Sequence, residues 1–266
     1  ILSSLPVKML NILRSECDSD FRNRNDFNPY MKPYFLTFLF IICCHPLAAQ
    51  SFLIDDFEAD TVGLLPERWY DRDTNYLLKD YNEKVKSTYK YTVLTDNGNQ
   101  FLRYEGSKAM HINFPLKNRE SLDIYKTPVL SWKWRIHDVP SGGNEDKDNR
   151  NDVAASVYVV FDLGKVLFRK VPKSIRYTWS TELPVGTELS KFFNNQKIVV
   201  VGSGKEGLGE WQSFERNIVE DYKRLFGDDP PSKPLAFLIL SDANDTKSFS
   251  KADYDEIRLV SANTNN

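Results

Sequence analysis

The chain has 266 residues with 35 Lys and Arg against 37 Asp and Glu, a formal net charge of −2 at pH 7. This balance lacks the positive excess of a nucleic-acid-binding protein, so we expect no nucleic acid partner. All three cysteines (Cys17, Cys43, Cys44) precede residue 51, and only His111 and His137 follow it. The segment 51–266 therefore has no thiol nucleophile, no disulfide and too few imidazoles for a zinc site of three histidines.

Residues 31–50 have the pattern of a secretory signal peptide. Met31 and Lys32 give a positive start, 35–44 is an apolar run, and 47–49 supply small residues before a cleavage point. The run is too short for a transmembrane helix, so we expect no transmembrane anchor. Residues 1–30 show no hydrophobic period, and we interpret them as upstream sequence joined to the true start. We therefore expect an exported bacterial protein, periplasmic or extracellular, with one domain over 51–266.

The elements expected after residue 50 are mostly short strands separated by turn signals. They cover 51–58, 89–95, 100–105, 109–114, 130–137, 153–161, 176–180, 197–201, 235–240 and 253–260. Asp96-Asn97-Gly98-Asn99 predicts a hairpin turn between the second and third of them. Apolar residues at helical spacing, with Gly227 as a cap, predict one short helix within 211–226. Together these elements predict an all-β fold, an antiparallel β-sandwich of jelly-roll, galactose-binding-like type.

The clearest strand pattern lies in 130–137. One face carries Leu130, Trp132, Trp134 and Ile136, and the other carries Ser131, Lys133, Arg135 and His137. This period of two predicts a buried face and a wetted face. The segment 153–161 is apolar on both faces, which predicts a strand deeper in its sheet.

Several segments resemble a family of exported bacterial proteins of unknown function, the DUF3047 family. They are DDFE at 55–58, WKWR at 132–135, NDVAASVYVVF at 151–161, YTWS at 177–180, SDANDT at 241–246 and YDEI at 254–257. The family implies no established activity. The opening DDFE and closing YDEI also resemble the first and last strands of galactose-binding-like jelly rolls, which include many carbohydrate-binding modules.

Polar and aromatic side chains of these strands form a candidate glycan cleft, because aromatic faces stack on sugar rings and charged groups bond to hydroxyls. The candidate ligand-binding residues are Lys133, Arg135, Tyr158, Tyr177, Trp179, Arg216, Asn217, Asp242 and Asp245. The alternative interpretation is a solvated outer face, in which Arg216 and Asp221 pair with Lys133 or Asp242.

Two other functions stay open. A glycan-cleaving hydrolase or lyase would need a carboxylate pair, and Asp152 with Asp242 or Asp245 supplies one. A structural envelope protein would instead bind another protein through a flat apolar patch.

Asp56, Glu58 and Asp255 lie on the first and last strands, which often pair in jelly rolls. Together they are a candidate calcium site, the alternative being carboxylates that face water at strand ends. The glycine-rich stretch 202–207 fits G-x-G-x-x-G, but no second strand follows its helix promptly. We therefore expect no nucleotide cofactor.

Overall fold

The computed structural model describes residues 50–80, 90–161, 165–166, 169–170 and 172–262. Residues 47–266 group as one compact unit. The predicted signal peptide, its cleavage point and the segment 1–30 lie outside the described residues, apart from Gln50. Among the described residues, none of the helices has the length and apolarity to cross a bilayer.

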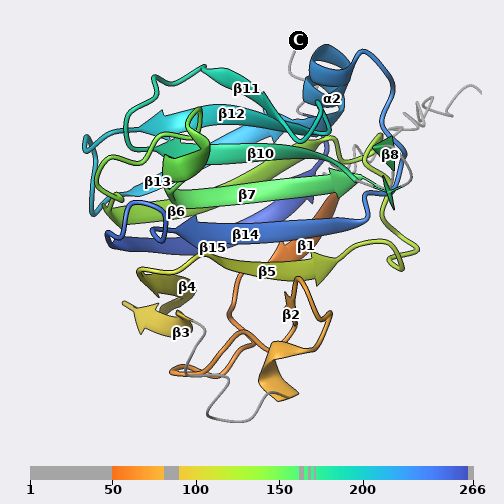
Figure 1. Ribbon diagram of the computed structural model, residues 1–266. Helices are drawn as coiled ribbons and strands as arrows, with labels where there is room; N and C mark the ends of the chain where they lie inside the picture. Colours follow the sequence, from red (N-terminus) through yellow and green to blue (C-terminus); the bar gives the residue numbers. More distant parts are fainter. Residues whose placement is uncertain (1–49, 81–89, 162–164, 167–168, 171, 263–266) are drawn as a thin grey trace, which may run out of the picture. The chain divides into compact units, whose positions relative to one another are not determined.

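Strands are the main regular elements of the described chain and form two main sheets (Figure 1). Sheet A has the order β13 (Trp211–Asn217), β6 (Val129–Asp138), β15 (Ser250–Val260), β4 (Asn99–Gly106) and β3 (Tyr91–Asp96), and β1 (Ser51–Asp55) also pairs with β15. Sheet B has the order β11 (Glu188–Lys191), β12 (Gln196–Ser203), β10 (Lys173–Ser180), β7 (Val153–Phe161), β14 (Ala236–Asp242), β5 (Met110–Pro115) and β2 (Tyr70–Asp71).

The remaining elements are short. They are β8 (Lys165–Val166), β9 (Arg169–Lys170), the 3-10 turns η2 (Leu78–Asp80) and η3 (Asp148–Arg150), and the helix α2 (Ile218–Phe226).

The two sheets enclose one aromatic core, which confirms the predicted all-β sandwich. Trp132 of β6 stacks on Tyr177 of β10 with ring centroids 5.6 Å apart, and Trp134 meets Trp179 at 6.4 Å. The four apolar residues of the 130–136 face are at most 1% exposed, as the period of two predicts. β7 is buried on both faces, also as predicted.

Two predictions about pairing are confirmed and one detail differs. Asn97 and Gly98 have φ of 53° and 83°, the left-handed pair that a two-residue hairpin needs. The first and last strands pair, since β1 runs antiparallel to β15. The sheets are not wholly antiparallel, because β12 runs parallel to β10. At the edge of the same sheet, β11 pairs with β12 as an antiparallel hairpin.

The predicted short helix is confirmed within 211–226. Residues 211–217 form β13, which pairs with β6, and only 218–226 are helical. Asn217 caps the helix by accepting hydrogen bonds from the N–H groups of Val219 and Glu220, and Gly227 ends it with φ of 78°. Sheet pairing along β6 therefore decides where the helix begins.

The outer face of sheet B differs from that of sheet A because it carries a second apolar cluster. The cluster comprises Val153, Tyr158, Ala236, Leu238 and Leu240, with Val160 and Leu235 packed against it. Alternate residues of β14, Phe237 and Ile239, point into the main core instead. Sheet B thus has apolar side chains on both sides, and those of the second cluster are at most 8% exposed.

Candidate functional site

A cavity of about 570 Å³ lies on the outer face of sheet B. Its floor is a patch of the second apolar cluster, formed by Tyr158 and Val160 of β7 with Ala236 and Leu238 of β14. This volume is within the range of roughly 300–1,000 Å³ that small-molecule sites occupy. We take this cavity as the candidate functional site.

Strand register explains how the floor is built. One cross-strand row joins Ser174, Val160, Ala236 and Pro115, and the next joins Arg176, Tyr158, Leu238 and Asn113. Apolar side chains of β7 and β14 fill the middle of each row, while polar ones from the flanking strands stand at one or both ends. The sheet therefore presents an apolar strip with polar margins.

Five amide side chains surround this strip: Asn75, Asn113, Asn118, Asn195 and Gln196. Within the part of the chain that the structure describes, Asn113 Oδ1 and Asn195 Nδ2 are buried without a hydrogen-bond partner. Leaving such an atom unpaired costs about 1–3 kcal/mol, so a turn of either amide toward a bound polar group would add stability. Because an amide both donates and accepts, the margin suits a ligand rich in hydroxyl groups.

Aromatic side chains complete the cavity. His111 lies beside Tyr158 with ring centroids 6.0 Å apart, and burial is the main cause that lowers the pKa of His111 to about 3. The imidazole is therefore neutral at physiological pH. Phe192, from the turn between β11 and β12, also lines the cavity and is 64% exposed.

The turn that carries Phe192 is strained. Phe192, Phe193 and Asn194 have φ of 50°, 55° and 68°, a run of three left-handed residues without glycine. Each such residue costs about 1–2 kcal/mol, and this kind of strain is typical of ligand-contacting segments.

The loop 139–152 closes the end of the outer face beyond the cavity. Glu145 of this loop is fully buried and accepts a hydrogen bond from Ser180 Oγ at 2.6 Å. Lys191 beside the strained turn donates to Asp148 at 2.6 Å and so joins the loop to β11. These contacts therefore hold the acidic loop in place at Glu145. The sequence of the loop does not indicate this burial.

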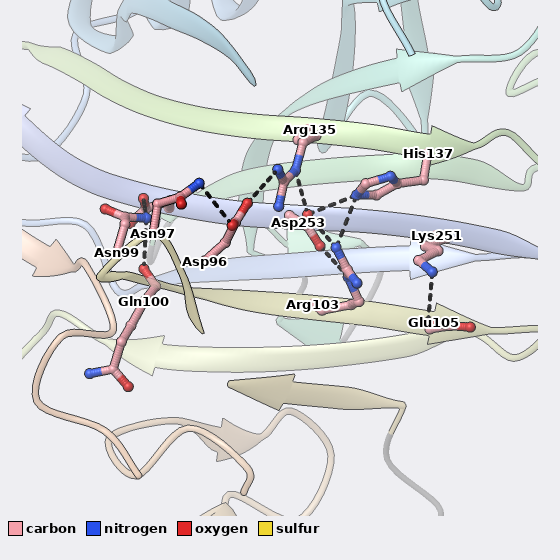
Figure 2. A network of polar contacts seen from close by, with 11 residues as sticks. Asp96, Asn97, Asn99, Gln100, Arg103, Glu105, Arg135, His137, Lys251 and Asp253 are labelled. Atoms are coloured by element: carbon pink, nitrogen blue, oxygen red, sulfur yellow. Dashed lines mark hydrogen bonds and ion pairs between the residues drawn. The ribbon is translucent and has the colours of Figure 1, made fainter. Parts of the chain in front are cut away.

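The predicted row on 133–137 lies on the outer face of the other sheet. Figure 2 shows that Arg135, His137 and Arg103 surround one carboxylate, Asp253. The Arg135 guanidinium also lies over Trp211, 4.7 Å from its ring centroid. These side chains satisfy one another and form a closed network.

Lys133, the remaining predicted residue on that face, pairs with Glu256 at 2.6 Å.

The structure distributes the other predicted ligand-binding residues over several places. Tyr177 and Trp179 are at most 2% exposed in the core, so neither can offer a ring face to a ligand. Arg216 pairs with Asp221 at 2.6 Å, and Asn217 is the helix cap. Of the nine predicted residues, Tyr158 alone is among those that line the cavity.

The carboxylates of the hydrolase or lyase alternative have structural partners. Asp152 is fully buried and accepts from the N–H groups of Asp245 and Thr246 and from Thr246 Oγ1. It therefore holds the loop after β14. Burial, followed by the nearby Asp152 charge, raises the pKa of Asp242 to about 7, while Asp245 is exposed.

The candidate calcium ligands are also engaged. Glu58 accepts from the Gln100 N–H at 2.8 Å, and Asp255 accepts from Asn99 Nδ2 at 2.9 Å. Asp56 accepts from the N–H of Glu58 at 3.4 Å. In the ranges that the structure describes, no three His, Cys, Asp or Glu side chains gather as a metal site. Calcium binding stays a prediction.

Sequence reasoning missed most of the cavity. Its lining residues come from segments between 72 and 238, and single asparagines scattered over 120 residues or more carry no periodic signal. The one usable signal was the apolar character of both faces of β7 and β14.

Several solved structures and one protein family are similar to this chain. Solved structures that resemble the chain include a family 11 carbohydrate-binding module of a cellulosomal cellulase of Clostridium thermocellum. That match has 11% identity and a TM-score of 0.37, and it covers 81% of this chain and 96% of the module. A family 30 carbohydrate-binding module of the same organism has 13% identity and a TM-score of 0.40, with 81% and 99% covered.

An endoglucanase 3 of family GH12 from Trichoderma harzianum matches at 10% identity and a TM-score of 0.36, with 82% and 99% covered. TM-scores this low carry no argument about what the chain binds. No curated protein sequence matches it. The family described as "protein of unknown function (DUF3047)" matches residues 78–258, and the chain therefore belongs to the DUF3047 family.

Proposed function

We propose that the protein is a non-catalytic glycan-binding β-sandwich whose ligand occupies the cavity on the outer face of sheet B. One observation carries the proposal: an apolar floor surrounded by amide side chains, two of which have buried, unpartnered polar atoms. A sugar ring has a matching form, with apolar C–H faces and hydroxyl groups around its edge.

The energetics favour such a ligand. The floor contributes about 25 cal/mol for each Å² of apolar surface that the sugar covers. Hydroxyl groups can bond to the amide side chains of the margin, and a turn of the Asn113 or Asn195 amide toward the ligand removes the cost of leaving Oδ1 or Nδ2 unpaired. A purely apolar ligand would cover the floor but leave both atoms unsatisfied.

A glycan array probed with the full chain tests the proposal. The Asn113→Ala variant removes the unpaired acceptor, and we expect about a tenfold loss of affinity, since a hydrogen bond contributes roughly 1.4 kcal/mol. The matched control is Arg135→Ala, which alters the outer face of sheet A and should leave binding unchanged. Loss of binding in the control with retention in Asn113→Ala would place the ligand on sheet A.

Export belongs to the same proposal. The pattern in 31–50 supports a signal peptide, so the protein recovered from the cell envelope should begin at Gln50 or Ser51. Mass spectrometry of the intact protein checks this, and a mass that retains residues 31–49 would contradict it. Repeating the array with a chelator tests the predicted calcium at Asp56, Glu58 and Asp255.

A further inference from the structure

We propose that the glycan is acidic, a polymer or oligomer of uronic acids whose carboxylates bind at the cavity. This inference rests on the proposed function and adds the charge of the ligand. The lining residues include the cations Arg72 and Lys117, and there is no Asp or Glu among them. A neutral glycan would form no ion pair with these cations, whereas a glycan that carries carboxylates would.

Arg72 is available to a ligand. Its side chain is 43% exposed, and its Nε donates to the exposed Asp73 at 2.8 Å. Neither Nη atom has an acceptor within hydrogen-bonding distance among the described residues. The two Nη groups can therefore bind both oxygens of a carboxylate, the geometry in which arginine binds most strongly.

Arg176 adds positive potential from behind the cavity wall. It is 2% exposed, and its guanidinium lies 5.5 Å from the ring centroid of the cavity residue Tyr158. Its Nε donates to Ser156 Oγ at 2.9 Å and its Nη1 to Asn151 Oδ1 at 3.2 Å, both neutral acceptors.

In the described ranges, Arg176 Nη2 has no hydrogen-bond partner and the guanidinium forms no ion pair, although the more distant charges of Asp242 and Glu145 also act on Tyr158. A buried cation without an adjacent anion is costly, and its field is weakly screened because little water surrounds it. That field favours an anion on the cavity side of Tyr158.

The lowered pKa of His111 reflects this positive potential. After burial, the next causes that lower its pKa are the charges of Arg72 and Arg176. Arg72, in the turn after β2, and Arg176 of β10 therefore both act on His111, and the charge of Asp73 opposes them only in part.

The charge of the whole chain limits the choice of anion. At a net charge of −2, the protein has no general attraction for any polyanion, so a polyuronate has to bind through the local cations. The cations are confined to a site with an apolar floor and amide margins. A sugar that carries a carboxylate is complementary to the cations, to the apolar floor and to the amide margins.

Affinity electrophoresis and calorimetry of the full chain with matched polymers test the inference. The probes are polygalacturonate and alginate, each compared with its fully esterified form, which keeps the sugar backbone and removes the charge. We expect at least about tenfold tighter binding of one acid than of its ester, which corresponds to roughly 1.4 kcal/mol. The preference should weaken as salt is raised.

The cavity is tested with Arg72→Gln and Lys117→Gln, each expected to weaken binding up to about fivefold, the effect of a partly exposed ion pair. The control is Lys205→Gln, which removes an exposed cation that does not line the cavity.

The outcomes separate the two proposals. Equal binding of acid and ester, or an array that returns only neutral glycans, would overturn the inference and leave the proposed function standing. Binding of an acid that persists unchanged in the Arg72 and Lys117 double variant would also overturn it. Absence of binding to the two acids, their esters and every glycan of the array would refute the proposed function itself.

Discussion

Replacing Asp253 by Asn tests whether the network on sheet A stabilises the fold without binding ligand (Figure 2). The Asp253 side chain is fully buried, and its Oδ1 accepts from Arg103 Nε at 2.6 Å. Its Oδ2 accepts from Arg135 Nε at 2.8 Å and lies 2.8 Å from His137 Nε2. The partners are 13% to 25% exposed, so they would be left partly buried beside a neutral group.

The expected cost follows from these contacts. Removing one partner of a buried ion pair costs about 3–5 kcal/mol, and the partial exposure of the cations places Asp253→Asn near the lower end, about 3 kcal/mol. For a domain of this size each kcal/mol lowers Tm by roughly 2–4 °C, so we expect Tm to fall by about 6–12 °C.

The pH dependence adds a second check. Burial opposes ionisation of Asp253, but the hydrogen bonds from Arg103, His137 and Arg135 outweigh it and hold the pKa below its usual value. A carboxyl whose pKa is lower in the folded state stabilises above its unfolded pKa and loses that contribution as the pH falls through the folded value. The difference between wild type and variant should therefore be largest at neutral pH and shrink below about pH 4.

Thermal melting followed by circular dichroism, at neutral and acidic pH, measures both effects. The control is Glu256→Gln, because Glu256 is 38% exposed and its pair with Lys133 contributes about 1 kcal/mol or less. A variant Asp253→Asn that melts with the wild type at neutral pH, or that keeps its stability and loses glycan binding, would refute the reasoning.

Three further changes probe the fold. In Gly202→Ala the new Cβ would lie 2.2 Å from Trp179 Cε3, so urea unfolding should show a loss of about 3 kcal/mol, and an unchanged midpoint would contradict the packing. Tyr177→Phe removes a hydrogen bond of 2.8 Å to Asp221, which retains Arg216, so we expect a loss of about 1 kcal/mol by the same measurement. Because the raised pKa of Asp242 makes the folded state bind the extra proton, wild-type stability should fall relative to Asp242→Asn as the pH rises from about 4 to about 7; parallel stability profiles would exclude this.

Local patterns were enough to predict the strands that form the core. The alternation through Trp132 and Trp134 identifies the buried face because side chains of a strand point to opposite sides. The Asn97-Gly98 turn predicts its hairpin because few residues adopt a positive φ. In both cases the information lies within a few residues of the chain.

The helix boundary shows where local patterns fail. The sequence predicts one helix within 211–226 but not its first residue, and residues 211–217 form an edge strand because β6 offers seven pairing positions. Tyr177 and Trp179 fail for a related reason. The sequence around them does not show which face of β10 is exposed to solvent. Both rings are buried because they pack on Trp132 and Trp134 of the opposing sheet.

The amino-acid sequence alone was sufficient to determine the all-β class and the face of β6 that packs in the core, because both depend on alternation along single strands. The cavity was decided by tertiary structure, since the order of the strands in sheet B brings Arg72, Asn113, Tyr158 and Asn195 together. Residues so far apart in the chain become neighbours only when strand order and register are set, and no local pattern encodes that order.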